Sequence, residues 1–182
     1  MGNIAVHEFL TLDGVFEDPR WTMDFGYDPK MGEAIGAIMG SCEALLLGRR
    51  TFEMFAPAWS TRTADDDPGA PFMNESPKYV VASTPPSVEW NNSAVLGRYH
   101  SDAIRELKDR TGGGLYVSGS GTLVRAMLSD GLVDELHLFV YPVAVGSGKR
   151  LFDDGTHTTK FSLAESQAYD NGVLHLDYRP VA

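Results

Sequence analysis

Residues 45–53 read Leu-Leu-Leu-Gly-Arg-Arg-Thr-Phe-Glu, and this stretch decides the fold class. A short, continuous apolar run that stops at a glycine is typical of a strand buried on both faces of a sheet. Arg49 and Arg50 follow directly, at the carboxyl edge where open α/β sheets bind their ligands. Guanidinium groups bind phosphate through paired hydrogen bonds, and Thr51 is a candidate cap for the next helix. The alternative interpretation is a solvated arginine pair without a ligand.

A second stretch, residues 117–123, reads Val-Ser-Gly-Ser-Gly-Thr-Leu. Here a strand runs into a glycine-rich turn and then into a helix. Glycines let the backbone approach a ligand closely, and free amides at a helix start favour an anion such as a pyrophosphate. The stretch lacks the last glycine of the G-x-G-x-x-G fingerprint, because that position holds Val124, so a tight turn without a ligand is the alternative. A dinucleotide needs both kinds of site, so the two stretches support each other.

Strand-like and helix-like segments alternate along the rest of the chain. The predicted strands are 4–12, 44–48, 78–83, 115–117, 133–143, 160–168 and 173–179, and the predicted helices begin near Pro29, Thr51, Ser101 and Gly121. This order predicts one three-layer α/β domain over residues 1–182, with a mostly parallel mixed sheet and helices on both faces. Asp170-Asn171-Gly172 predicts a C-terminal antiparallel hairpin. Residues 60–77, rich in Asp, Pro and Thr, are expected to form an exposed, disordered loop.

The segment of residues 12–28 combines acidic and aromatic side chains. It holds two rings that are candidates for substrate binding, Trp21 and Phe25, and two candidate catalytic carboxylates, Asp24 and Asp28. A flat heteroaromatic substrate would need stacking surfaces and one carboxylate to hold its ring nitrogens. The alternative is an acidic surface loop whose aromatic rings pack inward.

Composition argues against several classes of protein. The formal net charge of −10 makes the chain a poor general binder of nucleic acid or of an anionic membrane. The single cysteine, Cys42, excludes an intramolecular disulfide and suits a reducing cytoplasm. We expect a soluble cytoplasmic protein, because no basic leader or membrane-length apolar run is present. The histidines show no ligand spacing, so no metal site is predicted.

With these stretches, the chain resembles the dihydrofolate-reductase-like superfamily. Within it, the chain is similar to the small single-domain proteins of the type found in the reductase domain of riboflavin biosynthesis (the RibD C-terminal domain). The stretches that carry the resemblance come in the family order and span nearly the whole chain: 10–15, 47–53, 117–123, 133–136, Pro142 and 146–152.

This resemblance implies that NADPH is the cofactor. The residues implied are Gly48, Arg49, Arg50 and Thr51 for the adenosine 2′-phosphate and neighbouring phosphates, Ser83 near the adenosine ribose, Gly119, Ser120, Gly121, Thr122 and Leu123 for the pyrophosphate and its ribose, and Val15 and Phe16 along the nicotinamide. Two positions depart from the riboflavin-type pattern. Ser118 stands where those reductases carry a substrate-binding Glu, and residues 55–57 replace an Asp-Asp-Pro element. The resemblance therefore supports NADPH as the cofactor more strongly than it supports a particular substrate.

The resemblance favours an NADPH-dependent reductase of a small heteroaromatic compound, similar to 5-amino-6-(5-phosphoribosylamino)uracil reductase and to dihydrofolate reductase. A proton would come from Asp24, Asp28 or water. Two alternatives use the same fold without turnover: a non-catalytic NADP-binding or regulatory protein, and a binder of FMN or of a folate analogue. A homodimer is also expected, because riboflavin-type relatives commonly pair through their sheets.

Overall fold

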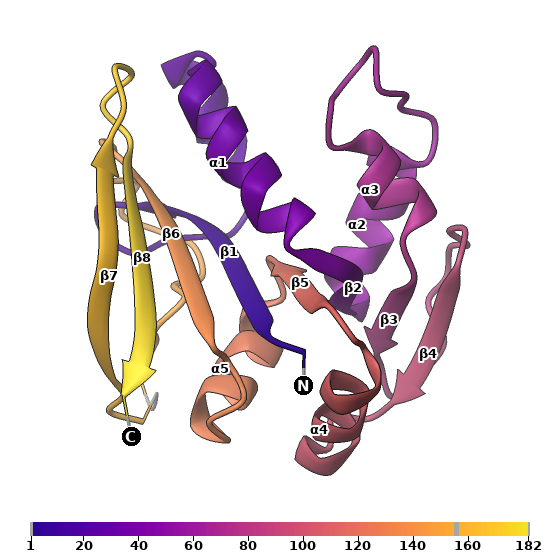
Figure 1. Cartoon of the computed structure of the whole chain (residues 1–182). Helices are drawn as coiled ribbons and strands as arrows, with labels where there is room; N and C mark the ends of the chain where they lie inside the picture. Colours follow the sequence, from indigo (N-terminus) through magenta and orange to yellow (C-terminus); the bar gives the residue numbers. More distant parts are fainter. Residues whose placement is uncertain (1, 155–156, 182) are drawn as a thin grey trace.

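The computed structural model describes residues 2–154 and 157–181, and its eight strands form one sheet (Figure 1). The strands lie in the order β4-β3-β2-β5-β1-β6-β8-β7. Strands β1 to β6 are parallel to one another, while β8 pairs antiparallel with both β6 and β7. The bounds are β1 (Ile4–Thr11), β2 (Cys42–Gly48), β3 (Lys78–Val81), β4 (Ser93–Gly97), β5 (Gly114–Ser118), β6 (Glu135–Tyr141), β7 (Lys160–Ala168) and β8 (Leu174–Val181).

Helices cover both faces of the sheet and complete three layers. One core packs α1 (Pro29–Gly40), α2 (Arg49–Trp59) and α3 (Ala70–Glu75) against the sheet, and the other packs α4 (Ser101–Arg110) and α5 (Gly121–Ser129). Side chains alternate along a strand, so Leu45 and Leu47 enter the first core and Leu46 enters the second. This explains the unbroken apolar run in β2, and the predicted α/β architecture with its mostly parallel sheet is confirmed.

The C-terminal hairpin also forms as predicted. β7 and β8 are joined through a turn in which the Gly172 N–H donates to the Tyr169 carbonyl at 3.0 Å. Gly172 has a φ of 86°, a backbone conformation that favours glycine. The hairpin leaves β7 at the edge of the sheet, with most of its side chains exposed. The expected homodimer stays a prediction, since the structure describes one chain.

Three local predictions are wrong. The strand β4 (Ser93–Gly97) was not predicted, because an exposed edge strand lacks an apolar run. Residues 60–77 are not a structureless loop: α3 forms there, and Ala70 and Met73 are buried. Thr51 does not cap α2 but lies within its first turn. Among the described residues, no helix has both the length and the apolar character needed to cross a bilayer.

Candidate functional site

The carboxyl ends of β2 and β5 interlock through two hydrogen bonds. The Gly48 N–H donates to the Ser120 hydroxyl at 2.9 Å, and the Ser120 N–H donates to the Thr51 hydroxyl at 3.0 Å. Each of the two sequence stretches therefore supplies a hydroxyl that satisfies a backbone amide of the other. The structure brings the arginine motif and the glycine-rich turn together at the same edge of the sheet.

Glycine is required at two positions of the turn at residues 118–121. Gly119 has a φ of 63°, and a Cβ atom there would lie 3.2 Å from the Thr51 side chain. At Gly121, a Cβ atom would lie 2.3 Å from the Phe16 ring. The missing side chains let Thr51 and the Phe16 ring pack directly against the backbone of the turn. Phe16 therefore lies beside the turn, whereas Val15 is buried next to Gly148, and the role of the two residues along the nicotinamide stays a prediction.

Arg49 and Arg50 occupy the first turn of α2, and both are exposed. The Arg49 guanidinium donates to the Thr84 hydroxyl at 3.0 Å, which brings it next to the segment that follows β3. Ser83 lies in that segment and is exposed as well. Two cations at the positive end of an eleven-residue helix suit a phosphate, and the role of Arg49 and Arg50 in holding one stays a prediction.

The remaining residues of the glycine-rich motif fall into two groups. The Thr122 side chain is exposed beside the turn, whereas the Leu123 side chain is buried in the core with Val124 and Met127. Leu123 can therefore meet a ligand only through its backbone. This geometry favours backbone amides as the main donors for an anion at the start of α5.

A loop between residues 142 and 151 fixes the position of Val15 and Phe16. The Asp13 carboxylate accepts from the N–H groups of Val145 at 3.2 Å and Gly146 at 2.9 Å. A hydrogen bond from the Thr11 hydroxyl, followed by these two, lowers the pKa of Asp13. The Phe16 N–H donates to the Lys149 carbonyl at 3.0 Å. The Gly-Ser-Gly-Lys-Arg stretch (residues 146–150) thus holds the segment that follows β1 in place, and the loop of residues 142–151 is named the clamp loop.

Two buried polar residues of β1, His7 and Glu8, were missed in the sequence interpretation. Glu8 is 3% exposed, and its Oε1 atom has no hydrogen-bond partner among the described residues. Burial raises the pKa of Glu8 well above its usual range, although a hydrogen bond from the Gly119 N–H opposes the shift. The available signal was a His-Glu pair inside an otherwise apolar strand. The raised pKa favours the uncharged form of Glu8 beneath the turn.

Replacing Glu8 with Gln should change how stability depends on pH. Because burial raises the folded pKa of Glu8 well above 4.5, the folded protein keeps this proton at pH values between 4.5 and the folded pKa, where the unfolded chain has lost it. Wild-type stability therefore falls as pH rises through this window, by up to about 1.4 kcal/mol per pH unit until the folded pKa is reached. The amide does not titrate, so the Gln variant should gain stability over wild type as pH increases.

Urea unfolding at about pH 4 and about pH 8 measures this difference, with the two proteins closest at the lower pH. An equal difference in unfolding free energy at both values would contradict the assignment of a neutral Glu8.

The loop of residues 12–28 contains a 3₁₀ helix over Pro19–Phe25 and turns its aromatic rings inward. Trp21 and Phe25 meet the Tyr141 ring edge-on, with centroids at 5.3 and 5.6 Å. Both rings are half-buried, and the Trp21 indole nitrogen is buried without a partner in the described part of the chain. Their role in substrate binding stays a prediction.

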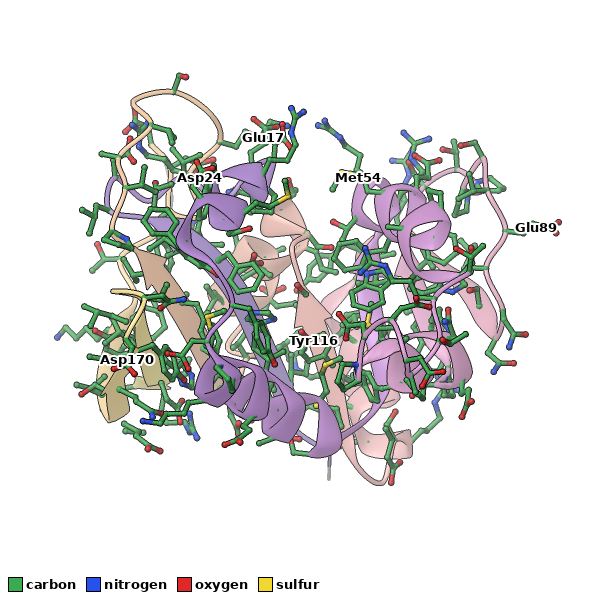
Figure 2. All side chains as sticks on the ribbon, turned by 90° about the horizontal axis from the view of Figure 1, so that it is seen from above. Glu17, Asp24, Met54, Glu89, Tyr116 and Asp170 are labelled. Carbon is green, nitrogen blue, oxygen red and sulfur yellow. The ribbon has the colours of Figure 1, made fainter. Side chains whose placement is uncertain are left out.

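The two candidate catalytic acids have different environments. Asp24 is exposed, and Figure 2 shows it with Glu17 on one side of the upper edge of the molecule, facing Met54 on the other. Asp28 is 6% exposed, and both of its oxygens accept backbone N–H groups: Lys30 at 2.9 Å and Asp170 at 3.0 Å. Asp28 is thus the N-cap of α1 and anchors the C-terminal hairpin, which leaves it poorly placed to donate a proton.

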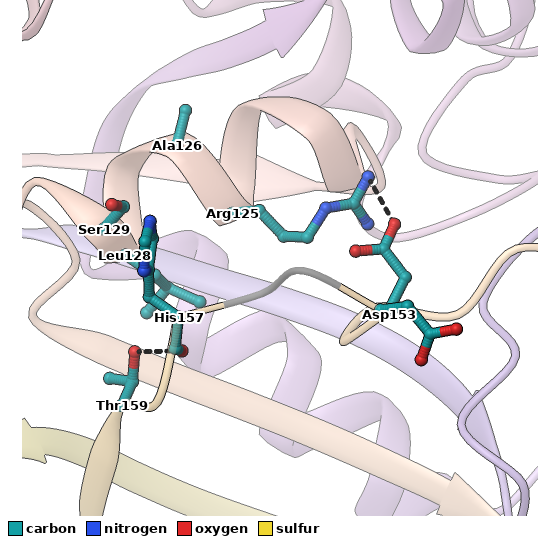
Figure 3. Close-up of a pocket in the computed structure, with 8 residues that line it drawn as sticks. Arg125, Ala126, Leu128, Ser129, Asp153, His157 and Thr159 are labelled. Atoms are coloured by element: carbon teal, nitrogen blue, oxygen red, sulfur yellow. Dashed lines mark hydrogen bonds and ion pairs between the residues drawn. The ribbon is translucent and has the colours of Figure 1, made fainter.

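A separate surface pocket of about 360 Å³ lies on the outer side of α5 (Figure 3). Its arginine, Arg125, donates to the carbonyl groups of Arg150 and Leu151, both at 3.1 Å, and pairs with Asp153 at 3.3 Å. These bonds tie the segment after the clamp loop to α5. The pocket therefore has a structural arginine and does not belong to the site at the strand ends.

Comparisons with known proteins agree with this architecture. The family described as the RibD C-terminal domain matches residues 3–175. The uncharacterized protein YyaP of Bacillus subtilis (strain 168) is 25% identical over 173 residues, covering 93% of this chain and 90% of YyaP.

Two solved structures share the fold over the whole chain. A putative riboflavin biosynthesis protein from Shewanella sp. PV-4 has a TM-score of 0.80 at 21% identity, with all of both chains covered. Dihydrofolate reductase from Enterococcus faecalis, complexed with NADP(H) and RAB-propyl, has a TM-score of 0.65 at 13% identity, covering 100% of this chain and 98% of that one. The predicted dihydrofolate-reductase-like fold is confirmed.

Proposed function

The chain belongs to the RibD C-terminal domain family, and from this premise we propose that it is an NADPH-dependent reductase of a small heteroaromatic compound. The observation that carries the proposal is the pair of hydrogen bonds that joins Gly48 and Thr51 to Ser120. Those bonds join the start of α2, which carries two arginines, to the glycine-rich start of α5. A cofactor with phosphates at two separated points matches that spacing of charge and amides.

The residues present fit NADPH. Arg49 and Arg50 would hold the 2′-phosphate, and Ser83 would lie near the adenosine ribose. Residues 119–123 would line the pyrophosphate site, and the amides of residues 121–123 would donate to it, because the N–H groups of Gly119 and Ser120 are already bonded to Glu8 and Thr51. The raised pKa of Glu8 supports this assignment, since it favours the uncharged acid, and a carboxylate buried under the turn would repel the phosphates.

Reduction would take place beside Val15 and Phe16. When bound, the cofactor supplies a hydride to an electrophilic carbon of the substrate. The chain itself would hold the cofactor against the two residues that the clamp loop fixes, and it would position the substrate ring against Trp21 or Phe25. For the proton we propose Asp24 or a water molecule, because the oxygens of Asp28 are already engaged.

A spectrophotometric assay tests the proposed reductase function. We expect the purified protein to oxidise NADPH in the presence of at least one compound from a panel of pterins, pyrimidines and quinones, and to prefer NADPH to NADH. Fluorescence titration with NADPH in the absence of substrate measures binding separately. Binding without oxidation across the panel would favour the non-catalytic alternative, which the Ser118 substitution motivates, and absence of binding would refute both.

A further inference from the structure

Two consecutive residues of the glycine-rich turn adopt the left-handed backbone conformation. Gly119 has a φ of 63° and Ser120 has a φ of 60°, a conformation that costs free energy in a residue with a side chain. Ser120 is also the N-cap residue of α5, but its side chain makes no cap bond, and its hydroxyl instead accepts the Gly48 N–H. The turn therefore depends on bonds from other elements to keep its shape.

The two strands that flank β5 both supply such a bond. The Thr51 hydroxyl, in α2 directly after β2, accepts the Ser120 N–H at 3.0 Å, and Glu8 on β1 accepts the Gly119 N–H. Because β2 and β1 lie on either side of β5, two successive amides of the turn are held from both sides. The next amides along the chain, those of residues 121–123, belong to the first turn of α5 and have no partner within the helix.

Glu8 is an unusual residue for its place in the core. It is 3% exposed, and it shares its face of β1 with Val6 and Leu10, while Leu138 lies opposite it on β6. Its Oε1 atom has no hydrogen-bond partner among the described residues. A buried carboxyl group costs free energy that an apolar side chain would not. The bond to the Gly119 N–H is the interaction that offsets this cost.

The bond to Gly119 needs an oxygen acceptor and no charge. Burial raises the pKa of Glu8, which favours the uncharged acid, and the carbonyl oxygen of that acid accepts an N–H as a carboxylate does. The nearest titratable neighbour in the chain, His7, points to the opposite face of the sheet, where its Nδ1 lies 2.6 Å from the Tyr116 hydroxyl. A glutamine at position 8 would offer the same carbonyl oxygen to the turn.

We propose that Glu8 is a positioning residue for the cofactor, which holds the Gly119 N–H and so keeps the turn in the shape that presents the amides of residues 121–123 to a pyrophosphate. Glu8 acts through the turn and does not itself touch the cofactor. This inference rests on the proposed NADPH-dependent function. NADPH and NADH both carry a pyrophosphate, so Glu8 supports the binding of both, whereas Arg49 and Arg50 would act on the 2′-phosphate alone.

The variant Glu8→Leu should raise the dissociation constants for NADPH and NADH by the same factor, about fivefold or more, the size of change that one hydrogen bond supplies. Glu8→Gln keeps the acceptor and should stay within about twofold of wild type for both cofactors. Glu106→Leu, at an exposed position of α4, is the matched control and should bind as wild type. Fluorescence titration measures all three variants. Unchanged affinity in Glu8→Leu, or an equal loss in Glu8→Leu and Glu8→Gln, would overturn the proposal.

Amide hydrogen exchange of the nitrogen-15-labelled wild-type protein tests the same bond without any variant. The Gly119 amide should exchange slowly with and without NADP⁺, because a buried hydrogen bond protects it, and the amide resonances of residues 121–123 should move when NADP⁺ binds. Exchange at Gly119 as fast as at the exposed Gly112 would overturn the proposal. Failure of both cofactors to bind the wild-type protein, with a protected Gly119 amide, would instead refute the proposed function.

Discussion

The double substitution Arg49→Ala/Arg50→Ala should raise the dissociation constant for NADPH by about 100-fold or more and leave that for NADH within about threefold. A hydrogen bond to a charged group contributes about 1.5–3 kcal/mol, so two arginines on one phosphate account for at least two factors of ten after allowance for their exposure. NADH lacks the 2′-phosphate and loses none of these bonds. The selectivity change, more than the loss itself, identifies the role of the arginines.

Fluorescence titration of both cofactors against the variant and wild type measures this selectivity. Arg110→Ala removes an exposed arginine at the end of α4 and serves as the matched control. Arg49 also bonds Thr84, so thermal unfolding must accompany the titration to separate lost binding from local disorder. An equal weakening of NADPH and NADH binding would show that the pair does not contact the 2′-phosphate.

The sequence was most informative where one strand end determines both fold and chemistry. The apolar run before Gly48 predicted a strand buried on both faces, and parallel pairing then requires its carboxyl end to share an edge with that of β5. The sequence could not reveal that Ser120 and Thr51 exchange hydrogen bonds. Those bonds depend on β2 and β5 being adjacent, and adjacency in a sheet is a property of the whole topology.

The features that were missed share a different physical cause. β4 and α3 are held by long-range pairing and packing, because neither segment has a strong local pattern of its own. The roles of His7 and Glu8 depend on burial and on partners far away in sequence, so a polar pair in an apolar strand could only be flagged as unusual. The riboflavin-type motif at residues 146–150 is a similar case, since its clamp on Val15 and Phe16 appears only in three dimensions.

Asp28 shows how a local signal can support two different interpretations. An acid before a proline is a strong signature of a helix start, but an acid in an aromatic loop is also a candidate proton donor. The structure shows the first role directly, through the bonds to the N–H groups of Lys30 and Asp170. The role as proton donor predicts a different kcat for Asp28→Asn than the role as helix cap does, and the two roles can therefore be separated by experiment.

Asp28→Ala should lower the free energy of unfolding by about 2–3 kcal/mol, because it removes both the cap of α1 and the anchor of the hairpin. Asp28→Asn keeps one amide oxygen, and asparagine caps helices as well as aspartate does, so its loss should be about 1 kcal/mol. Asp24→Ala is the control at an exposed position and should change stability by no more than about 0.5 kcal/mol. Urea unfolding measures all three variants.

The turnover of Asp28→Asn decides between the two roles. If Asp28 is structural, the folded asparagine variant should keep the kcat of wild type at temperatures well below its unfolding transition, since an amide preserves the shape of the helix start. If Asp28 donates the proton, the same variant should be as stable as expected but should lose about 100-fold or more in kcat, because an amide cannot act as a general acid. Only a large loss of kcat with retained stability would restore Asp28 as the catalytic acid.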